Sequence, residues 1–375
     1  MRKKGWLWCG FLSFLLLCGC AEPKVIEEIG LITASGYDPG KNGTILGTLV
    51  ELKIDPVATN DVVILETESS TIRGIRNAAN KKTSKGLASG QLRVILYGEG
   101  MFNKGNTGIA ESLSTDPVIS DLTYLAMADG KARDILQLKA KQIPDIGIHL
   151  YNLINQNTKV KIMPSATLQE VLHNHFTVGK DPVLPILKKE GNKEIAFSGV
   201  AIFKGSNLVG KISTEQSFYL TLLTDKFKSG SIDIEINSDS SKLEPINRRL
   251  NKIVASLDSI GSSSDIKLIN KEKVEFDLNV NLTARLLEIT SQISLGNPEN
   301  IKLIEKEINK SMKKEIEKLI AYFQSKESDV VGLGEVYKSS VRHSKLTDEK
   351  WYKMLKEAKV NVNLDFTIRR TGLIE

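Results

Sequence analysis

The stretch Val274-Glu275-Phe276-Asp277-Leu278-Asn279-Val280-Asn281-Leu282 is the clearest structural signal in the chain. Apolar and polar side chains alternate along it at strict period two. Successive side chains of a strand point to opposite faces of the sheet, so this pattern predicts a strand with one buried face. A second run with the same alternation, residues 360–368, closes the chain. The C-terminal region therefore contains at least two strands of one sheet.

A long amphipathic helix is predicted between these two strands. Asn297 is a suitable N-cap, and Pro298 follows at the first helical position. Apolar residues then recur every three or four positions and form one stripe over roughly 25 residues: Ile301, Ile304, Ile308, Met312, Ile316 and Leu319. We expect this helix to pack on the sheet rather than to form a coiled coil.

The preceding region has the pattern of a hairpin followed by a helix and a strand. Residues 195–203 and 208–212 read as two strands joined by a turn at 204–207. Thr214 is the expected N-cap of a helix that runs to about Phe227, and residues 232–236 alternate as a half-buried strand.

The N-terminal region alternates strands with helices, which favours an α/β layer structure. The expected strands are residues 29–34, 44–54, 62–67, 92–98 and 122–128, the first of them stopped by residues 35–40. Helices are expected at 71–82 and 106–113, and the pattern from 146 to 178 is helical. Pro182, Pro185 and the charged residues 188–193 look like a linker or an exposed turn.

These patterns predict an α/β (α+β) protein of three domains, each with a mixed or antiparallel sheet and packed helices. The expected divisions are residues 20–190, 191–262 and 263–375.

The first nineteen residues have the features of a bacterial lipoprotein signal. A basic cluster, residues 2–4, precedes an apolar stretch at 6–17 that is too short for a membrane-spanning helix of about 20 residues. The stretch ends in Leu17-Cys18-Gly19-Cys20, which resembles a lipobox. Small Gly19 lets a peptidase reach the Gly19–Cys20 bond, and the Cys20 thiol is the nucleophile that takes a diacylglyceryl group. The alternatives to a lipoprotein signal are an ordinary signal peptide with an incidental cysteine and an uncleaved membrane anchor.

The cysteine content agrees with lipidation at Cys20. Of three cysteines, Cys9 and Cys18 lie in the segment to be removed, so no disulfide is expected in the mature chain. Cys20 would carry an N-palmitoyl group and an S-diacylglycerol group. Two or three acyl chains hold a protein firmly, and we expect the body on the outer face of the cell membrane.

Charge and motif content give no positive case for an enzyme, a metal site or a cofactor. The formal charge of +6 includes three residues of the signal, which leaves +6 − 3 = +3, too little to argue for nucleic-acid binding. His173 and His175 point about 200° apart on a helix and cannot share a metal unaided. His149 and His343 are isolated, and the glycines at 98–100 and 332–334 complete no phosphate-binding or dinucleotide motif.

Four blocks of sequence resemble, in order, the C-subunit lipoproteins of spore germinant receptors, the Ger(x)C family. They are Glu28–Asp38, Gly98-Glu99, Phe197–Ile212 with Glu215, and Asp329–Gly334 followed by Trp351 and by the end strand with Gly372. The similarity covers nearly the whole mature chain. Many members carry Trp-Asp directly after the lipidated cysteine, where this chain has Ala21-Glu22-Pro23.

The resemblance implies three α/β domains and a non-enzymatic subunit without a cofactor. Such a subunit acts beside two membrane subunits, A and B, on the spore inner membrane. The complex, rather than this chain, would sense the small-molecule germinant, and no ligand-binding residue can be named. A solute-binding lipoprotein of an importer is the alternative function, although the low aromatic content and the three-part pattern disfavour it, and an envelope hydrolase is a third possibility.

Overall fold

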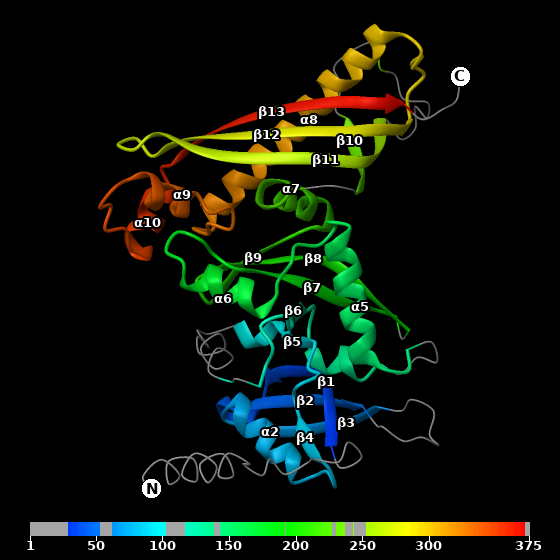
Figure 1. Ribbon diagram of the computed structural model, residues 1–375, viewed down its shortest axis with the longest axis vertical. Helices are drawn as coiled ribbons and strands as arrows, with labels where there is room; N and C mark the ends of the chain where they lie inside the picture. Colours follow the sequence, from blue (N-terminus) through cyan, green and yellow to red (C-terminus); the bar gives the residue numbers. More distant parts are fainter. Residues whose placement is uncertain are drawn as a thin grey trace, which may run out of the picture.

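A computed structural model describes residues 29–52, 62–102, 116, 118–138, 143–191, 193–226, 230–236, 243 and 253–371. The strands of these ranges form two sheets, one of nine strands and one of four (Figure 1). The predicted α+β character is confirmed. Gly19, Cys20 and the helix expected at 106–113 lie outside the described residues.

The larger sheet has the order β3-β2-β1-β5-β6-β7-β8-β9, with the short strand β4 paired to β1. Its strands are β1 Ile29–Pro39, β2 Ile45–Leu52, β3 Val62–Ser69, β4 Gly86–Ala88, β5 Val94–Gly98, β6 Tyr124–Ala128, β7 Val183–Glu190, β8 Glu194–Lys204 and β9 Asn207–Ile212. The pairs β1–β5, β5–β6 and β6–β7 are parallel, as expected where helices connect the strands. Every residue of the central strand β5 is buried, which explains its continuous apolar sequence.

Helices cover both faces of this sheet. One face packs against α2, Ile72–Asn80, and α6, Leu168–Phe176. The other packs against α4, Ala132–Leu136, and α5, Ile146–Lys159. Local caps set where they begin: the Thr71 hydroxyl accepts from the Gly74 N–H, and the Asp145 carboxylate accepts from two N–H groups of α5.

Two expectations for the N-terminal half are wrong. β1 does not stop at residue 35 but continues to Pro39, because it pairs with β2 along that whole length. Residues 183–190 are not a linker but β7, which pairs with β6 on one side and β8 on the other. Most of its apolar residues are buried in the sheet, and the charged residues 188–190 are its last residues, which pair with residues 194–196 of β8.

The four-stranded sheet has the order β10-β11-β12-β13. Its strands are β10 Ser231–Ile236, β11 Ile253–Asn270, β12 Glu275–Ile289 and β13 Lys359–Thr371. The two alternating runs found in the sequence belong to β12 and β13 and pair in parallel, with Leu278 opposite Val362 and Leu282 opposite Phe366. Residue 263, where we expected the third region to begin, lies inside β11, and the division into three domains stays a prediction.

The long helix α8, Pro298–Ser325, packs on this small sheet (Figure 1), with the predicted stripe buried except for the half-buried Ile301. The Asn297 side chain caps it by accepting from the Glu299 N–H. Two short helices, α9 Leu333–Ser340 and α10 Asp348–Leu355, follow it before β13.

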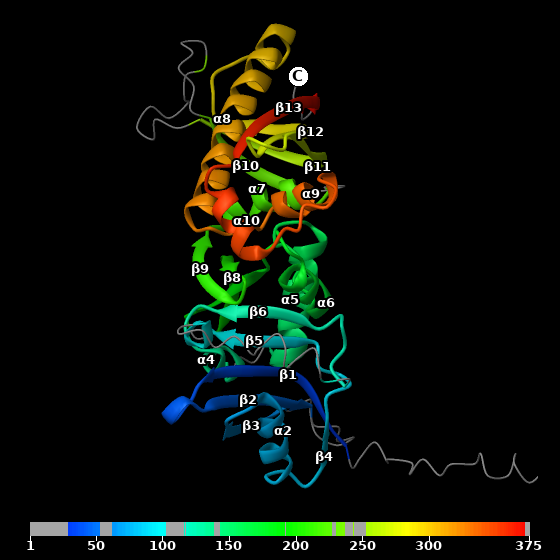
Figure 2. The same ribbon diagram turned by 90° about the vertical axis from the view of Figure 1, so that its left-hand side faces the viewer.

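Helix α7, Thr214–Thr224, lies between the two sheets (Figures 1 and 2). The residues from Ser217 to Leu223 are all buried, because α7 contacts β8 below and β11 and α8 above. Its N-cap is Ser213, one residue earlier than expected, with its hydroxyl accepting from the Gln216 N–H. One apolar core therefore runs from β8 through α7 into the small sheet.

Candidate functional site

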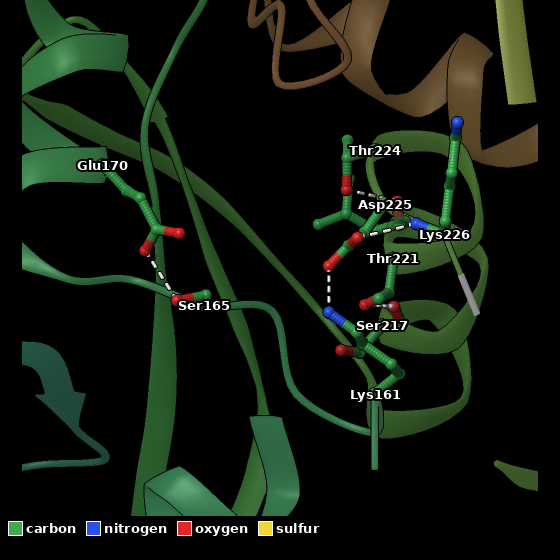
Figure 3. Close-up of polar contacts among 9 residues, drawn as sticks. Lys161, Ser165, Glu170, Ser217, Thr221, Thr224, Asp225 and Lys226 are labelled. Atoms are coloured by element: carbon green, nitrogen blue, oxygen red, sulfur yellow. Dashed lines mark hydrogen bonds and ion pairs between the residues drawn. The ribbon is translucent and has the colours of Figure 1, made fainter. Parts of the chain in front are cut away.

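A polar cleft of about 550 Å³ lies where the large sheet's helices meet α7. Its lining comes from the loop before α6, from α6 itself, from residues 180–183 and from the C-terminal half of α7. Figure 3 shows the polar side chains on its two sides. The cleft is a meeting point of segments that are far apart in the sequence.

On one side of the cleft, Glu170 closes the N-terminus of α6. Its Oε2 atom accepts from the Ser165 hydroxyl at 2.6 Å (Figure 3). The same atom accepts from the Thr167 N–H at 2.9 Å. The Thr167 hydroxyl in turn accepts from the Glu170 N–H, which completes a capping box. This carboxylate is thus used to position α6.

On the other side, polar contacts hold α7 to the chain that follows α5. Lys161 pairs with Asp225 at the C-terminus of α7 (Figure 3). The Ser217 hydroxyl donates to the carbonyl of Ile162 at 3.1 Å. The hydroxyls of Thr221 and Thr224 donate to α7 carbonyls one turn earlier.

Most polar groups around the cleft are therefore engaged within the protein. Of the histidines on α6, His173 is exposed, and His175 stacks edge-on against Phe176. Throughout the described ranges there is no group of three or more His, Cys, Asp or Glu side chains that could hold a metal ion. The hydrogen bonds and the ion pair around the cleft hold α6 and α7 to the chain segments next to them.

Behind the cleft, Asp181 joins the large sheet to the C-terminal helices. Its Oδ1 atom accepts from the Gly205 N–H in the β8–β9 turn and from the Tyr352 hydroxyl of α10, both at 2.7 Å. Its Oδ2 atom accepts from the Asp329 N–H at 2.7 Å, while the Asp181 N–H donates to the Asp329 carbonyl at 2.8 Å. One buried side chain thus links three separate segments.

Asp329 organises the loop that leads into α9. Its Oδ1 accepts from the N–H groups of Gly332 and Leu333, at 2.8 and 3.0 Å. Its Oδ2 accepts from the Gly334 N–H at 2.7 Å and from the indole N–H of Trp351 at 2.9 Å. A carboxylate at a helix N-terminus satisfies N–H groups that have no partner inside the helix. The sequence block Asp329–Gly334 with Trp351 therefore has a structural explanation.

Burial changes the acidity of both carboxyl groups. Burial raises the pKa of Asp329 to about 6, and the charge of the neighbouring Asp181 adds to this rise. The backbone N–H groups that donate to Asp329 act in the opposite direction and lower its pKa. Burial also raises the pKa of Asp181. A buried charge is costly unless it is fully hydrogen-bonded, which is why four donors surround Asp329.

Two glycines allow the turn before β7 to lie directly against the start of α9. Gly179, with φ +86°, lies so near α9 that an added Cβ would be 2.5 Å from the Gly334 Cα atom. The Gly334 Cα in turn faces the Trp351 ring, and the Glu335 N–H donates to the Gly179 carbonyl at 3.1 Å. The turn before β7 and the start of α9 therefore touch backbone to backbone.

A second buried contact explains the N-terminal motif residues. Asp38, at the end of β1, accepts from the N–H groups of Ala132 and Arg133 at 2.9 Å and so caps α4. Gly98 faces it, since a Cβ at that position would lie 1.9 Å from the Asp38 Oδ1 atom. Two sequence blocks that are 60 residues apart thus form one contact.

The structure separates the residues that sequence reasoning found from those it missed. Asp38, Gly98, Asp329 and Trp351 stood out as motif residues, and each is placed in a buried polar contact. Asp181 was missed, because a single aspartate between Lys180 and Pro182 carries no spacing signal. The lipidation candidate Cys20 and the cleavage residue Gly19 lie outside the described residues. Among the helices that the structure describes, none has the length and apolar character to cross a membrane.

Comparisons with known proteins agree with this architecture. The family model described as spore germination protein N-terminal domain matches residues 22–189, and the one described as spore germination B3/GerAC-like, C-terminal matches residues 198–372. Spore germination protein GerQC of Bacillus cereus is 27% identical over 99% of this chain and 100% of its own length. Spore germination protein KC of Bacillus subtilis is 21% identical over 96% of this chain and 94% of its own.

The fold has a counterpart among solved structures. The crystal structure of the GerBC protein matches with a TM-score of 0.55 at 15% identity, covering 89% of this chain and 96% of that one. With two successive family models spanning the body of the chain and a full-length relative, the chain belongs to the Ger(x)C family of germinant receptor C subunits.

Proposed function

We propose that this chain is a lipid-anchored C subunit of a nutrient germinant receptor, and that it helps to trigger spore germination by contacting the A and B membrane subunits. The observation that carries the proposal is the Gly19-Cys20 pair at the end of a signal-like segment, on a chain of this family. Its work would be done by surfaces and not by a catalytic group.

The anchor would fix where the subunit acts. An S-diacylglycerol and an N-palmitoyl group on Cys20 each contribute about 0.8 kcal/mol per buried CH₂, so the protein would stay on the outer face of the cell membrane, which is the inner membrane of the spore. Confinement to this layer raises the effective concentration of the subunit near its partners without any new contact.

The structure supports a role as a rigid connector. Helix α7 shares one apolar core with both sheets, and Asp181 links the large sheet to α10 through hydrogen bonds. A body of this kind presents its surfaces at fixed positions relative to one another, which would let it hold two membrane subunits in one arrangement.

The germinant itself would be sensed by the complex and not by this chain. Ligand pockets are mostly apolar with a few free polar groups that converge on the ligand. In the cleft between α6 and α7 most polar groups are already bonded within the protein. Calorimetric titration of the chain with amino acids and sugars should therefore give no binding heat, whereas micromolar binding would favour the importer alternative.

The test of the proposal is Cys20→Ala, with Cys18→Ala as the matched control inside the signal. Cys20→Ala should release the protein from membranes and slow nutrient germination in a strain without paralogous receptors. Cys18→Ala should leave both unchanged, because that residue is removed with the signal. Normal membrane retention and normal germination with Cys20→Ala would contradict the proposal.

A further inference from the structure

One end of the molecule carries a cluster of lysines without neighbouring acids in sequence. From Ser69 to Gly98 the chain has no Asp or Glu, and it has six basic residues: Arg73, Arg76, Lys81, Lys82, Lys85 and Arg93. Arg76 pairs with Asp116 and Arg93 packs over the Tyr151 ring. The three lysines, which we call the lysine turn, lie between α2 and β4.

The lysine turn lies beside the start of the described chain. β4 pairs with β1 in parallel, with Gly86 opposite Ile29. In a parallel pair, the residues that precede both partners leave the sheet at the same end. Lys85 precedes Gly86, and the segment that leads back to Cys20 precedes Ile29. The lysine turn therefore lies at the end of the sheet where β1 begins.

The segment between Cys20 and Ile29 is short. Nine Cα–Cα steps span at most about 30 Å even when fully extended. An acylated Cys20 would hold Ile29 within about that distance of the bilayer, and the lysine turn lies next to the start of β1. This end is also the one farthest from the small sheet: α2 and β4 lie at the bottom of Figure 1, and β10–β13 lie at the top.

The lysines are available to an external partner. Lys81 and Lys82 are exposed. The Lys82 Nζ donates to the carbonyl of Glu66 at 2.7 Å, a neutral group that leaves the ammonium charge uncompensated. Lys85 is half-buried and lies near the buried Glu51 carboxylate, which offsets part of its charge. No ion pair to Lys81 is formed within the described ranges.

We propose that the lysine turn, Lys81, Lys82 and Lys85, rests on anionic lipid headgroups and orients the tethered protein with its small sheet pointing away from the bilayer. This rests on the lipid anchor proposed above. The segment from Ala21 to Glu28 carries three acids and one lysine, so it adds no attraction of its own. Basic residues beside a lipid anchor gain affinity from the negative surface potential of the membrane, and the effect falls off within a Debye length.

The test uses the full lipidated chain in vesicles. Because the mature chain has no cysteine besides the acylated one, Ser84→Cys gives a single labelling site in the exposed lysine turn. Ser294→Cys gives the matched site in the exposed segment before α8, at the far end of the molecule. The vesicles are phosphatidylcholine with or without phosphatidylglycerol, and a quencher attached to the lipid headgroups reports proximity.

We expect the fluorophore at position 84 to be quenched in vesicles with phosphatidylglycerol and to recover in high salt, while the one at 294 stays unquenched. The triple variant Lys81→Gln, Lys82→Gln, Lys85→Gln should abolish the quenching, since each neutralised lysine lowers surface affinity by up to about fivefold. Neutralising three exposed lysines of α8, Lys302, Lys306 and Lys314, is the charge-matched control and should have no effect. Lys81→Gln alone should weaken the quenching without touching any internal contact.

Two negative results have different meanings. If the protein floats with the vesicles but position 84 is equally unquenched with and without phosphatidylglycerol, the anchor holds and the proposed orientation is wrong. If the protein does not float, the lipid anchor fails and the orientation fails with it. A change in the fluorescence at position 84 that occurs only when the A and B subunits are present would also overturn the proposal, because it would indicate a protein contact.

Discussion

Replacing Gly179 with Ala tests the backbone contact between the turn before β7 and the start of α9. Gly179 has φ +86°, a left-handed conformation that costs other residues about 1–2 kcal/mol. The new Cβ would also lie 2.5 Å from the Gly334 Cα and 2.8 Å from the Glu335 N atom. Overpacking of this kind costs about 1–3 kcal/mol. We expect the variant to lose about 3 kcal/mol of unfolding free energy.

Gly191→Ala is the matched control. Gly191 also has a positive φ, +58°, but nothing lies within 4 Å of its Cβ position, so only the backbone cost of about 1 kcal/mol applies. Guanidinium unfolding of the mature chain can be followed at Trp351, because the other two tryptophans, Trp6 and Trp8, lie in the signal. Trp351 is buried beside Gly334 and reports on this junction. Equal losses in the two variants would refute the close contact.

Three further predictions concern the buried polar contacts. Trp351→Phe removes the indole N–H that donates to Asp329, and a hydrogen bond to a charged group is worth about 1.5–3 kcal/mol. Unfolding followed by circular dichroism should show a loss of about 2 kcal/mol in the free energy of unfolding. A loss under about 0.5 kcal/mol would count against the hydrogen bond. Gly98→Ala should displace Asp38 from the start of α4 and lower the unfolding midpoint, whereas Gly90→Ala, with open space at its Cβ position, should leave it unchanged. Lys204 and Lys356 lower the pKa of Glu327 to about 2 in the folded protein, so this group adds stability above its unfolded pKa of about 4.5 and loses it as pH falls toward 2. The unfolding midpoint should then fall less from pH 5 to pH 3 in Glu327→Gln than in the unchanged protein, and parallel curves would contradict the ion pairs.

Periodicity predicted the elements that have one buried face. β12, β13 and α8 were predicted because each shows its polar and apolar faces in the sequence. β7 was mistaken for a linker or an exposed turn because Pro182, Pro185 and the charged residues 188–193 outweighed a short apolar run. Only the neighbouring strands make that run a strand. The continuation of β1 through Gly36 likewise depends on β2, not on the local sequence.

The candidate site was less predictable, because its contacts join distant residues. Asp181 and Asp329 are 148 positions apart, and no local pattern pairs them. The glycines at 98 and 179 are required by the atoms they face, which a sequence does not display. The lipidation candidate Cys20, in contrast, is recognised from its immediate neighbours and needs no tertiary information.

The central claim is that an acylated Cys20 holds this subunit among its membrane partners. Affinity purification of the chain from detergent-extracted spore membranes, followed by mass spectrometry, tests it most directly. The account predicts an N-terminal peptide that begins at Cys20 and carries a diacylglyceryl and an acyl group, recovered together with the A and B subunits. A free thiol at Cys20, in a protein that purifies alone from the soluble fraction, would contradict it.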